Sequence, residues 1–475
     1  MKDASLKNLN ILFALRDAEV FHYKHILLTL AKRGHRIRIV YDKRWSNAHA
    51  LEKLQDCLKE FPRIEYAVAK TRTGISRDIL FHVRELLSFR RYVMVRGQSS
   101  YYRDRWFGYL PKTAQKIFAW PGMEGLLSMR MTGFFLTSIE SVIPPVRGVM
   151  ADIQEFNPDV LFASPVTLRF SSSEVEYLKA AIRMHIPSVV SVLTWDNLTT
   201  KGLMHVFPDR LLVWNEAQAN EAVVHQFFPK ERIRITGSTL FDDWILHCSP
   251  SAAREEFCRA HGLRPEDPII TYLGSSSHMA SDETWIIAQL CSAFDASEDP
   301  RTRRMQIIVR PHPANYHIYE KINLRDVVAV PAKGSLRDTE GALQLFYNTL
   351  YYSEAAIEGA NTTAIIEAII AKKPAIAYVS DEYKKTQMDT KHFNQLVSEK
   401  ALYLASTAQE VVRIVGDVMS GNDARIRERE NFLKKYIRPL GEGHLAAEAI
   451  ADEIERIAVK KARGSALDRE TKMYK

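Results

Sequence analysis

Two series of short apolar runs alternate with segments of helical periodicity, and this alternation constrains the fold more than any other feature of the sequence. The first series has runs at residues 10–15, 36–41, 158–163, 188–193, 210–214 and 232–236. Apolar residues at helical spacing separate the first two runs and end at Gly34, and a second helical stretch covers residues 173–185. Strands that alternate with helices form a parallel sheet covered on both faces. The residues therefore predict an α/β fold.

The alternation restarts near Pro268 and predicts a second α/β domain. Strands are expected at 269–273, 306–309 and 375–378, with helices at 282–294 and 362–371. We expect an N-terminal domain over 1–248, a linker with a charged helix over 249–266 and a C-terminal domain over 267–435. Residues 436–475 are expected to form a helix that crosses back to the N-terminal domain, followed by a basic tail that frays.

The basic charge of the chain is concentrated in one segment. The sequence of 475 residues has 65 Lys and Arg against 57 Asp and Glu, a net charge of +8. An irregular block at 70–147 holds 13 Lys and Arg and 5 Asp and Glu. Its net charge of +8 equals that of the whole chain. Aromatic residues are interleaved with these cations, a composition that suits anionic headgroups or phosphates.

We expect this block to meet an anionic membrane surface, with Arg90, Arg91, Arg103 and Arg105 contributing. The alternative is a solvated helical insertion whose aromatic residues pack on their own domain. Nucleic acid is not an expected partner, because no recognition-helix or RNA-module motif accompanies the charge.

The cysteines and the chain start indicate the compartment. Cys57, Cys248, Cys258 and Cys291 have no C-x-x-C spacing, so neither a disulfide framework nor a zinc site is expected. No secretory leader is visible, and no apolar stretch approaches the length of a membrane span. We expect a cytoplasmic protein that does not span the membrane. No Asp-x-Asp motif follows a predicted strand, so no metal ion is expected.

Three polar segments stand out in the second half: two follow predicted strands, and the third opens the helix predicted at 362–371. They are Gly274-Ser275-Ser276, Arg310-Pro311-His312-Pro313, and Asn361-Thr362-Thr363 with Glu367 further along. Open α/β sheets bind ligands at the carboxyl ends of their strands. Small residues allow a phosphate to approach the backbone, an arginine can fork onto it, and a capped helix directs its free amides toward it.

Together these segments predict a nucleotide diphosphate site, in which Glu367 reaches a ribose diol. Taken singly, the first segment also fits an ordinary Gly-Ser turn, the second a loop histidine with its hydrogen bonds made within the protein, and the third a plain capped helix. A Walker loop and the G-x-G-x-x-G fingerprint are both missing, which disfavours ATP hydrolysis and nicotinamide chemistry.

Two segments of the first half provide candidates for the acceptor side. The loop after the first strand contains Arg16, Asp17, Glu19 and His22, of which Glu19 or His22 is the candidate general base. A helix-capping carboxylate and a surface histidine are the alternatives for these two. Asp196 and Asn197 follow the strand at 188–193 and are expected to line the acceptor side.

Several of these segments resemble the GT-B family of glycosyltransferases. The likeness is carried by F-H-Y-K-H-I-L-L-T-L-A-K-R-G-H-R-I-R-I-V near the start, by Trp214-Asn215-Glu216 through Thr236-Gly237 to Asp242, and by the Arg310 to Pro313 motif. The last is similar to the His-Pro motif of UDP-N-acetylglucosamine 2-epimerases, CDP-glycerol glycerophosphotransferases and bacterial sialyltransferases. The resemblance implies two facing Rossmann-like domains with parallel sheets and a cleft between them.

By this resemblance the C-terminal domain binds the donor and the N-terminal domain binds the acceptor. Glu367 would bind ribose, Thr362 and Thr363 the phosphates, and His312 the phosphate or the sugar-nucleotide moiety. We therefore expect an inverting, metal-independent glycosyltransferase of cell-envelope glycan or glycolipid synthesis that uses a UDP-sugar as substrate and needs no cofactor.

The expected acceptor is lipid-linked or anionic, which places the enzyme at the inner face of the membrane. The alternatives are a CDP-glycerol glycerophosphotransferase-like transferase, a 2-epimerase-like isomerase and a non-catalytic GT-B scaffold.

Overall fold

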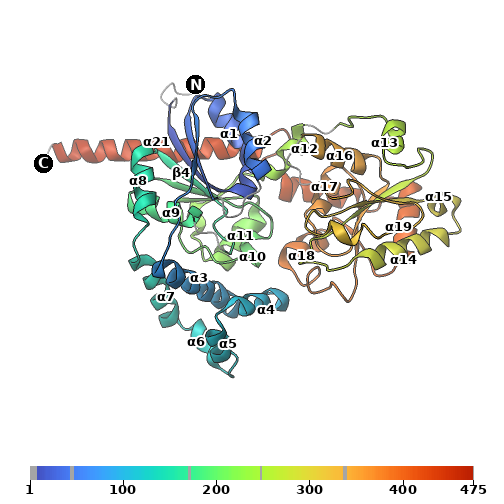
Figure 1. The fold of residues 1–475 in the computed structure, drawn as a ribbon, viewed down its shortest axis with the longest axis horizontal. Helices are drawn as coiled ribbons and strands as arrows, with labels where there is room; N and C mark the ends of the chain where they lie inside the picture. Colours follow the sequence, from blue (N-terminus) through green and yellow to red (C-terminus); the bar gives the residue numbers. More distant parts are fainter. Residues whose placement is uncertain (1–7, 43–47, 170–172, 247–248, 335–339, 474–475) are drawn as a thin grey trace. The chain divides into compact units, whose positions relative to one another are not determined.

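The chain forms two compact units. The computed structural model describes residues 8–42, 48–169, 173–246, 249–334 and 340–473 (Figure 1). Unit 1 comprises Met1–Gln98, Tyr102–Asp242 and Tyr436–Lys475, and unit 2 comprises Ser99–Tyr101 and Asp243–Lys435. Each unit contains one wholly parallel sheet, which confirms the predicted α/β fold.

The sheet of unit 1 has seven strands in the order β3-β2-β1-β4-β5-β6-β7. All six strands predicted in this half are present. The seventh, the edge strand β3, was not predicted because its residues are only partly buried and form no apolar run. The strands are β1 (Asn10–Arg16), β2 (Arg36–Asp42), β3 (Ile64–Val68), β4 (Val160–Ser164), β5 (Ser188–Ser191), β6 (Arg210–Val213) and β7 (Ile233–Ile235).

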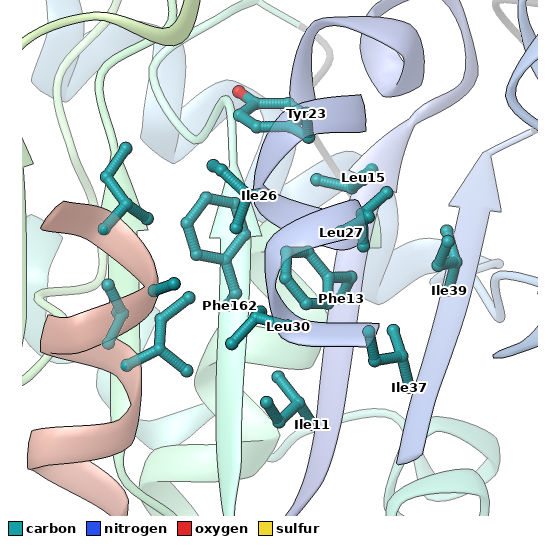
Figure 2. Packing of buried hydrophobic residues seen from close by; sticks show 14 of the residues in the cluster. Ile11, Phe13, Leu15, Tyr23, Ile26, Leu27, Leu30, Ile37, Ile39 and Phe162 are labelled. Atoms are coloured by element: carbon teal, nitrogen blue, oxygen red, sulfur yellow. The ribbon is translucent and has the colours of Figure 1, made fainter. Parts of the chain in front are cut away.

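Alternate residues of β1 belong to two different cores, one on each face of the sheet. Ile11, Phe13 and Leu15 pack in one cluster, while Leu12 and Ala14 pack in the other. Successive side chains of a strand point to opposite faces, so an uninterrupted apolar run is expected when helices cover both. Figure 2 shows the first cluster, in which β1 lies beside the apolar face of α1 (Lys24–Lys32).

Unit 1 also contains α2 (Ala48–Leu58), α8 (Arg147–Phe156), α9 (Ser173–Arg183), α10 (Asn197–Thr200) and α11 (Glu216–Gln226). Helix α21 (Ala446–Met473) contributes Ala447, Ile450 and Ile454 to the same core as α1. It includes most of residues 456–475, the segment for which the sequence predicts fraying.

The segment between β3 and α8, interpreted from sequence as irregular, is helical. Its buried positions include Glu85 and Arg91 on the longest helix, so charged residues interrupt the apolar period by which a helix is recognised. The structure fits the alternative of a helical insertion. Its helices are α3 (Ile75–Met94), α4 (Ser100–Tyr109), α5 (Lys112–Phe118), α6 (Met123–Ser128) and α7 (Arg130–Val142).

The sheet of unit 2 has six strands in the order β10-β9-β8-β11-β12-β13. The predicted strands correspond to β8, β9 and β12. The other three were not predicted: β10 and β13 have three residues each, and β11 ends in a buried glutamate, Glu358. The strands are β8 (Ile269–Leu273), β9 (Gln306–Arg310), β10 (Val327–Ala329), β11 (Ala355–Glu358), β12 (Ala375–Tyr378) and β13 (Tyr403–Ala405).

Helices cover both faces of this sheet as well. The helices of this part of the chain are α12 (Asp242–Leu246), α13 (Arg254–Ala260), α14 (Thr284–Asp295), α15 (Pro300–Arg303), α16 (Glu340–Tyr351), α17 (Ala364–Ile370), α18 (Lys391–Ser398), α19 (Ala408–Met419) and α20 (Ile426–Phe432). The short helical turns are η2 (Asp17–Tyr23), η4 (Lys230–Arg232), η5 (Thr239–Phe241), η6 (Tyr316–Ile318) and η7 (Leu433–Ile437). Among the described residues, no helix is both long and apolar enough to cross a bilayer.

Candidate functional site

The three polar segments predicted to bind the donor meet at one edge of the sheet of unit 2. Strands β9, β8 and β11 are direct neighbours and run parallel, so their carboxyl ends lie side by side. The segments that follow them begin at Gly274, Pro311 and Gly359. Ligands of open α/β sheets bind at such an edge. We call these segments the donor edge of unit 2.

Gly274 joins the first two segments of the donor edge. Its N–H donates to the carbonyl of Arg310 at 2.9 Å. A Cβ atom at this position would lie 2.6 Å from Oη of Tyr319 and 3.1 Å from the carbonyl oxygen of Arg310. Only glycine fits without displacement of a neighbour, so the glycine fixes how closely the ends of β8 and β9 approach.

Ser275 and Ser276 differ in their exposure to solvent. Ser275 is fully buried, and both its N–H and its hydroxyl donate to the Glu283 carboxylate, at 2.6 and 3.2 Å. Ser276 is partly exposed, and its carbonyl accepts the N–H groups of Met279 and Ala280. Ser275 therefore shapes the loop, while Ser276 is the residue of the pair that solvent reaches.

Glu283 organises this loop and was missed by the sequence analysis. The phenol groups of Tyr272 and Tyr319 donate to its two carboxylate oxygens, each at 3.1 Å, in addition to the two bonds from Ser275. Burial raises the pKa of Glu283 to about 7, although these four hydrogen bonds favour the ionised form. Its position just before α14 was the only sequence signal, and it is a common place for a carboxylate.

Arg310 is the last residue of β9, and His312 follows it in the second segment. Arg310 is buried, with its guanidinium carbon 4.0 Å from the centre of the Phe346 ring. His312 is partly exposed, and its Nδ1 accepts the N–H of Ala314 at 3.1 Å. In the neutral ring this leaves the proton on Nε2, which can donate to a ligand oxygen.

Glu358 is the last residue of β11 and is fully buried. Its Oε2 accepts the N–H of Thr362 at 3.0 Å, and its Oε1 has no hydrogen-bond partner among the described residues. Burial raises the pKa of Glu358 well above its usual range, the bond from Thr362 opposes this, and nearby Glu283 reinforces it. Two buried carboxyl groups thus support the donor edge.

The helix predicted to begin at Asn361 and Thr362 begins later, at Ala364, with Thr363 as its N-cap residue. The amide of Asn361 instead donates to the carbonyl of Thr386 and to Thr390 Oγ1, and it lies 2.8 Å from His392 Nε2. Since these contacts hold Asn361 outside the helix, the start shifts along the chain. Thr362 and Thr363 are both partly exposed.

Glu367 lies in the interior of unit 2. It is fully buried, and its Oε1 accepts the indole N–H of Trp244 at 2.8 Å. The indole ring packs against Phe346 and Tyr347. The contact with ribose implied by the family resemblance stays a prediction.

The predicted acceptor residues of unit 1 lie at the carboxyl ends of β1 and β5. Arg16 is buried at the end of β1, and His22 is partly exposed in η2. Burial raises the pKa of nearby Glu174 to about 7, an effect that Arg16 opposes. The side chains of Asp17 and Glu19 lie outside the described part of the chain, so the choice between Glu19 and His22 as base stays a prediction.

Asp196 and Asn197 hold the loop after β5. Asn197 Oδ1 accepts the backbone N–H groups of Leu193 and Thr194, at 3.1 and 3.0 Å. Asp196 accepts the hydroxyl groups of Thr194 and Thr200, and Lys201 pairs with it at 3.1 Å. Their contact with an acceptor stays a prediction.

A cavity of about 360 Å³ lies in unit 1 between the helical insertion and the segment that follows β4. Leu80, Phe81 and Trp106 form part of its wall together with charged side chains that include Arg84, Glu85, Arg169 and Glu176. This cavity was not foreseen, because its residues come from three separate parts of the chain.

Glu85 is the ionisable wall residue of most chemical interest. Its carboxylate accepts a hydrogen bond from Arg169 at 3.0 Å. Burial raises the pKa of Glu85 to about 7, and Arg169 opposes the shift. Burial also lowers the pKa of His205, another wall residue, to about 3, with a smaller contribution from Arg84. The cavity thus offers a neutral imidazole and a carboxyl group that titrates near neutrality.

Solved structures similar to this chain extend over nearly its full length. The UDP-GlcNAc 2-epimerase from Methanocaldococcus jannaschii matches 93% of this chain and 98% of its own, with 11% identity and a TM-score of 0.52. The same enzyme from Neisseria meningitidis, bound to UDP-GlcNAc, matches 95% and 100%, with 10% identity and a TM-score of 0.52. A glycosyltransferase from Rickettsia africae matches 95% and 98%, with 10% identity and a TM-score of 0.53.

The chain has the GT-B fold. Similarity at 10 or 11% identity is evidence of fold alone, because one fold hosts many reactions. No family model matches this GT-B chain, and no curated protein matches it by sequence. The reaction of this GT-B protein therefore has to be argued from its own residues.

Proposed function

We propose that this GT-B protein is a glycosyltransferase that moves a sugar from a nucleotide-activated donor to a hydroxyl acceptor. The observation that carries the proposal is the donor edge, where the partly exposed Ser276, His312 and Thr362 follow three adjacent parallel strands. Support for the donor class comes from the similar structures, one of which is an epimerase bound to UDP-GlcNAc.

In the proposed reaction the acceptor hydroxyl oxygen attacks the anomeric carbon as the bond from that carbon to the diphosphate oxygen breaks. The electron pair of the broken bond leaves with the diphosphate, and the configuration at carbon inverts. Arg310 and His312 stabilise the charge that develops on the diphosphate. A base of the first loop of unit 1, Glu19 or His22, takes the hydroxyl proton.

The cavity of unit 1 is the proposed place for a part of the acceptor remote from the reacting hydroxyl, because neither candidate base is among the described residues that line it. It is large enough for a sugar ring, and its aromatic wall at Phe81 suits the apolar face of such a ring. Arg84, which pairs with Glu140, and the Arg169–Glu85 ion pair suit hydroxyl and carboxylate groups. An anionic glycan is therefore the proposed acceptor class, and a lipid link on it is proposed from the basic and aromatic composition of the insertion.

The test of the donor site is titration calorimetry with UDP. Replacing His312 by Ala removes the Nε2 donor, so the dissociation constant for UDP should rise at least about tenfold, the equivalent of about 1.4 kcal/mol. The control is His317→Ala, an exposed histidine in the same unit, which should bind UDP like the wild type. If His312→Ala bound UDP with the affinity of the wild type, the donor site would not lie at this edge.

The reaction itself is tested with UDP-, GDP-, CDP- and CMP-activated donors. Release of a nucleoside diphosphate, or of CMP from a CMP-activated sugar, that depends on an added acceptor supports the glycosyltransferase. Two second candidates are the 2-epimerase, favoured by the similar structures, and the CDP-glycerol transferase, favoured by the Arg310 to Pro313 motif. Interconversion of UDP-GlcNAc with its 2-epimer identifies the former, and release of CMP from CDP-glycerol identifies the latter.

A further inference from the structure

Helix α7 of the insertion exposes large apolar side chains. Met131, Phe134, Phe135 and Val142 are 78%, 76%, 64% and 79% exposed. Phe134, Phe135 and Val142 follow Met131 by three, four and eleven residues, which places all four on one side of the helix. Scattered exposed apolar residues are ordinary, but an apolar stripe on the outer side of a surface helix is not.

The opposite side of α7 is buried in the protein interior. Gly133, Leu136 and Glu140 are buried, and Glu140 accepts two hydrogen bonds from Arg84, each at 2.9 Å. A Cβ atom at Gly133 would lie 2.7 Å from the guanidinium of Arg90, so the backbone is closely packed there. The helix cannot turn its apolar stripe inward without losing these contacts.

The neighbouring segments also expose apolar side chains. Helix α6 contacts both α5 and α7, and α3 contacts both α6 and α7 (Figure 1). Exposed apolar side chains continue on this part of the chain at Ile117, Trp120, Leu126 and Met129. We call the exposed apolar residues of 117–142 the α7 face.

The exposed charges beside the α7 face are positive. Lys112, Lys116 and Arg130 are exposed. The two carboxylates of residues 112–142 are both engaged, since Glu124 pairs with Arg103 at 2.6 Å and Glu140 is buried. A cationic surface with apolar side chains complements an anionic bilayer, where cations meet phosphates and aromatic rings enter the interface.

The four arginines expected from sequence to meet the membrane are used inside unit 1. Arg91 is fully buried and donates to the carbonyls of Leu198 and Lys201. Arg90 donates to the carbonyl of Met129, Arg103 pairs with Glu124, and Arg105 donates to Tyr109. Their replacement would disturb the fold and would not report on a membrane.

We propose that the α7 face docks peripherally on a bilayer of anionic phospholipids. Trp120, Phe134 and Phe135 enter the boundary between headgroups and acyl chains, while Lys112, Lys116 and Arg130 contact headgroup phosphates. A second copy of the chain fits this face less well, because two identical cationic surfaces repel each other. The inference does not depend on the donor or on the reaction.

The test is co-sedimentation of the full chain with vesicles of phosphatidylcholine and phosphatidylglycerol in about a two-to-one ratio. Wild-type protein should sediment with these vesicles and not with pure phosphatidylcholine. The double variant Phe134→Ser/Phe135→Ser should reduce the partition coefficient at least about tenfold, because two rings no longer enter the interface. The triple variant Lys112→Gln/Lys116→Gln/Arg130→Gln should weaken binding and reduce its salt dependence.

The matched control is Ile426→Ser, which removes an exposed apolar side chain from unit 2 and should leave vesicle binding unchanged. All these positions are exposed, so the variants should fold, and circular dichroism with thermal unfolding checks this separately. Failure of the wild type to bind anionic vesicles would overturn the proposal, as would unchanged binding by the double phenylalanine variant. A dimer in light scattering that the phenylalanine variant dissociates would assign the face to a second copy instead.

Discussion

At the scale of residues, the donor edge depends on buried carboxyl groups that its sequence motifs do not contain. The glycine, serine and arginine residues of this edge follow predicted strands, so their place at strand ends could be predicted, while the threonines were predicted only as the start of a helix. Glu283 and Glu358 could not be found in this way. Their role follows from neighbours distant in sequence, such as Tyr319, which reaches Glu283 from a position 36 residues away.

The raised pKa of Glu283 makes the stability of the protein depend on pH. In the folded chain this carboxyl titrates near pH 7, against 4.5 for an exposed glutamate. Between these values the folded state binds the additional proton, so the free energy of unfolding falls as the pH rises through this window. Replacing Glu283 by Gln should remove about 2–3 kcal/mol of that decline.

Denaturant unfolding at pH 5 and pH 8 measures this difference, with about 1.4 kcal/mol expected for each unit of pKa shift. Glu298→Gln, an exposed glutamate in unit 2, serves as the control and should follow the wild type. If Glu283→Gln also followed the wild type, the carboxyl would have an ordinary pKa.

At the scale of elements, the approach of β8 to β9 requires a residue without a side chain. Replacing Gly274 by Ala would place a Cβ atom 2.6 Å from the Tyr319 hydroxyl and 3.1 Å from a backbone carbonyl. The strands must then separate, so we expect a loss of about 1–3 kcal/mol of stability and weaker binding of UDP.

Thermal unfolding and UDP titration of Gly274→Ala check both expectations. The control is Gly341→Ala in α16, where no atom lies within 4 Å of the new Cβ and alanine should stabilise the helix slightly. If Gly274→Ala kept the UDP affinity and the stability of the wild type, the loop would tolerate a wider separation of β8 and β9.

Fully buried runs account for the strands predicted in unit 2. The runs at 269–273 and 375–378 coincide with β8 and β12 because each strand is buried on both faces. Strand β10, with three partly buried residues, offered no such run. Helix α3 escaped detection because buried Arg91 and Glu85 stand where apolar residues are expected.

At the scale of the whole molecule, unit 1 is assembled from both ends of the chain. Asp242 accepts the N–H groups of Ala446 and Ala447, at 3.0 and 2.9 Å, and so caps α21 at the point where the chain returns. The helix then places Ile450 and Ile454 in the core formed by β1 and α1. The cavity of unit 1 shows the same dependence on distant segments, which is why sequence analysis missed it.

Replacing Ile454 by Ala tests how strongly unit 1 depends on α21. The side chain is fully buried, so the loss should be about 2–5 kcal/mol. Hydrogen exchange should show reduced protection in β1 and β2 and unchanged protection in β8. The control Ile426→Ala, at an exposed position, should alter neither unit. Equal loss of protection in both units would mean that they unfold together.

The return of α21 also orders the events of synthesis on the ribosome. Residues 243–435 are translated before Ala446 exists, so unit 2 can complete its sheet while the core around Ile11 and Phe13 still lacks a wall. The first part of the chain to be made is then the last to close. During this interval its apolar strands are open to chaperones and to mispairing, and a translation pause before residue 446 would lengthen it.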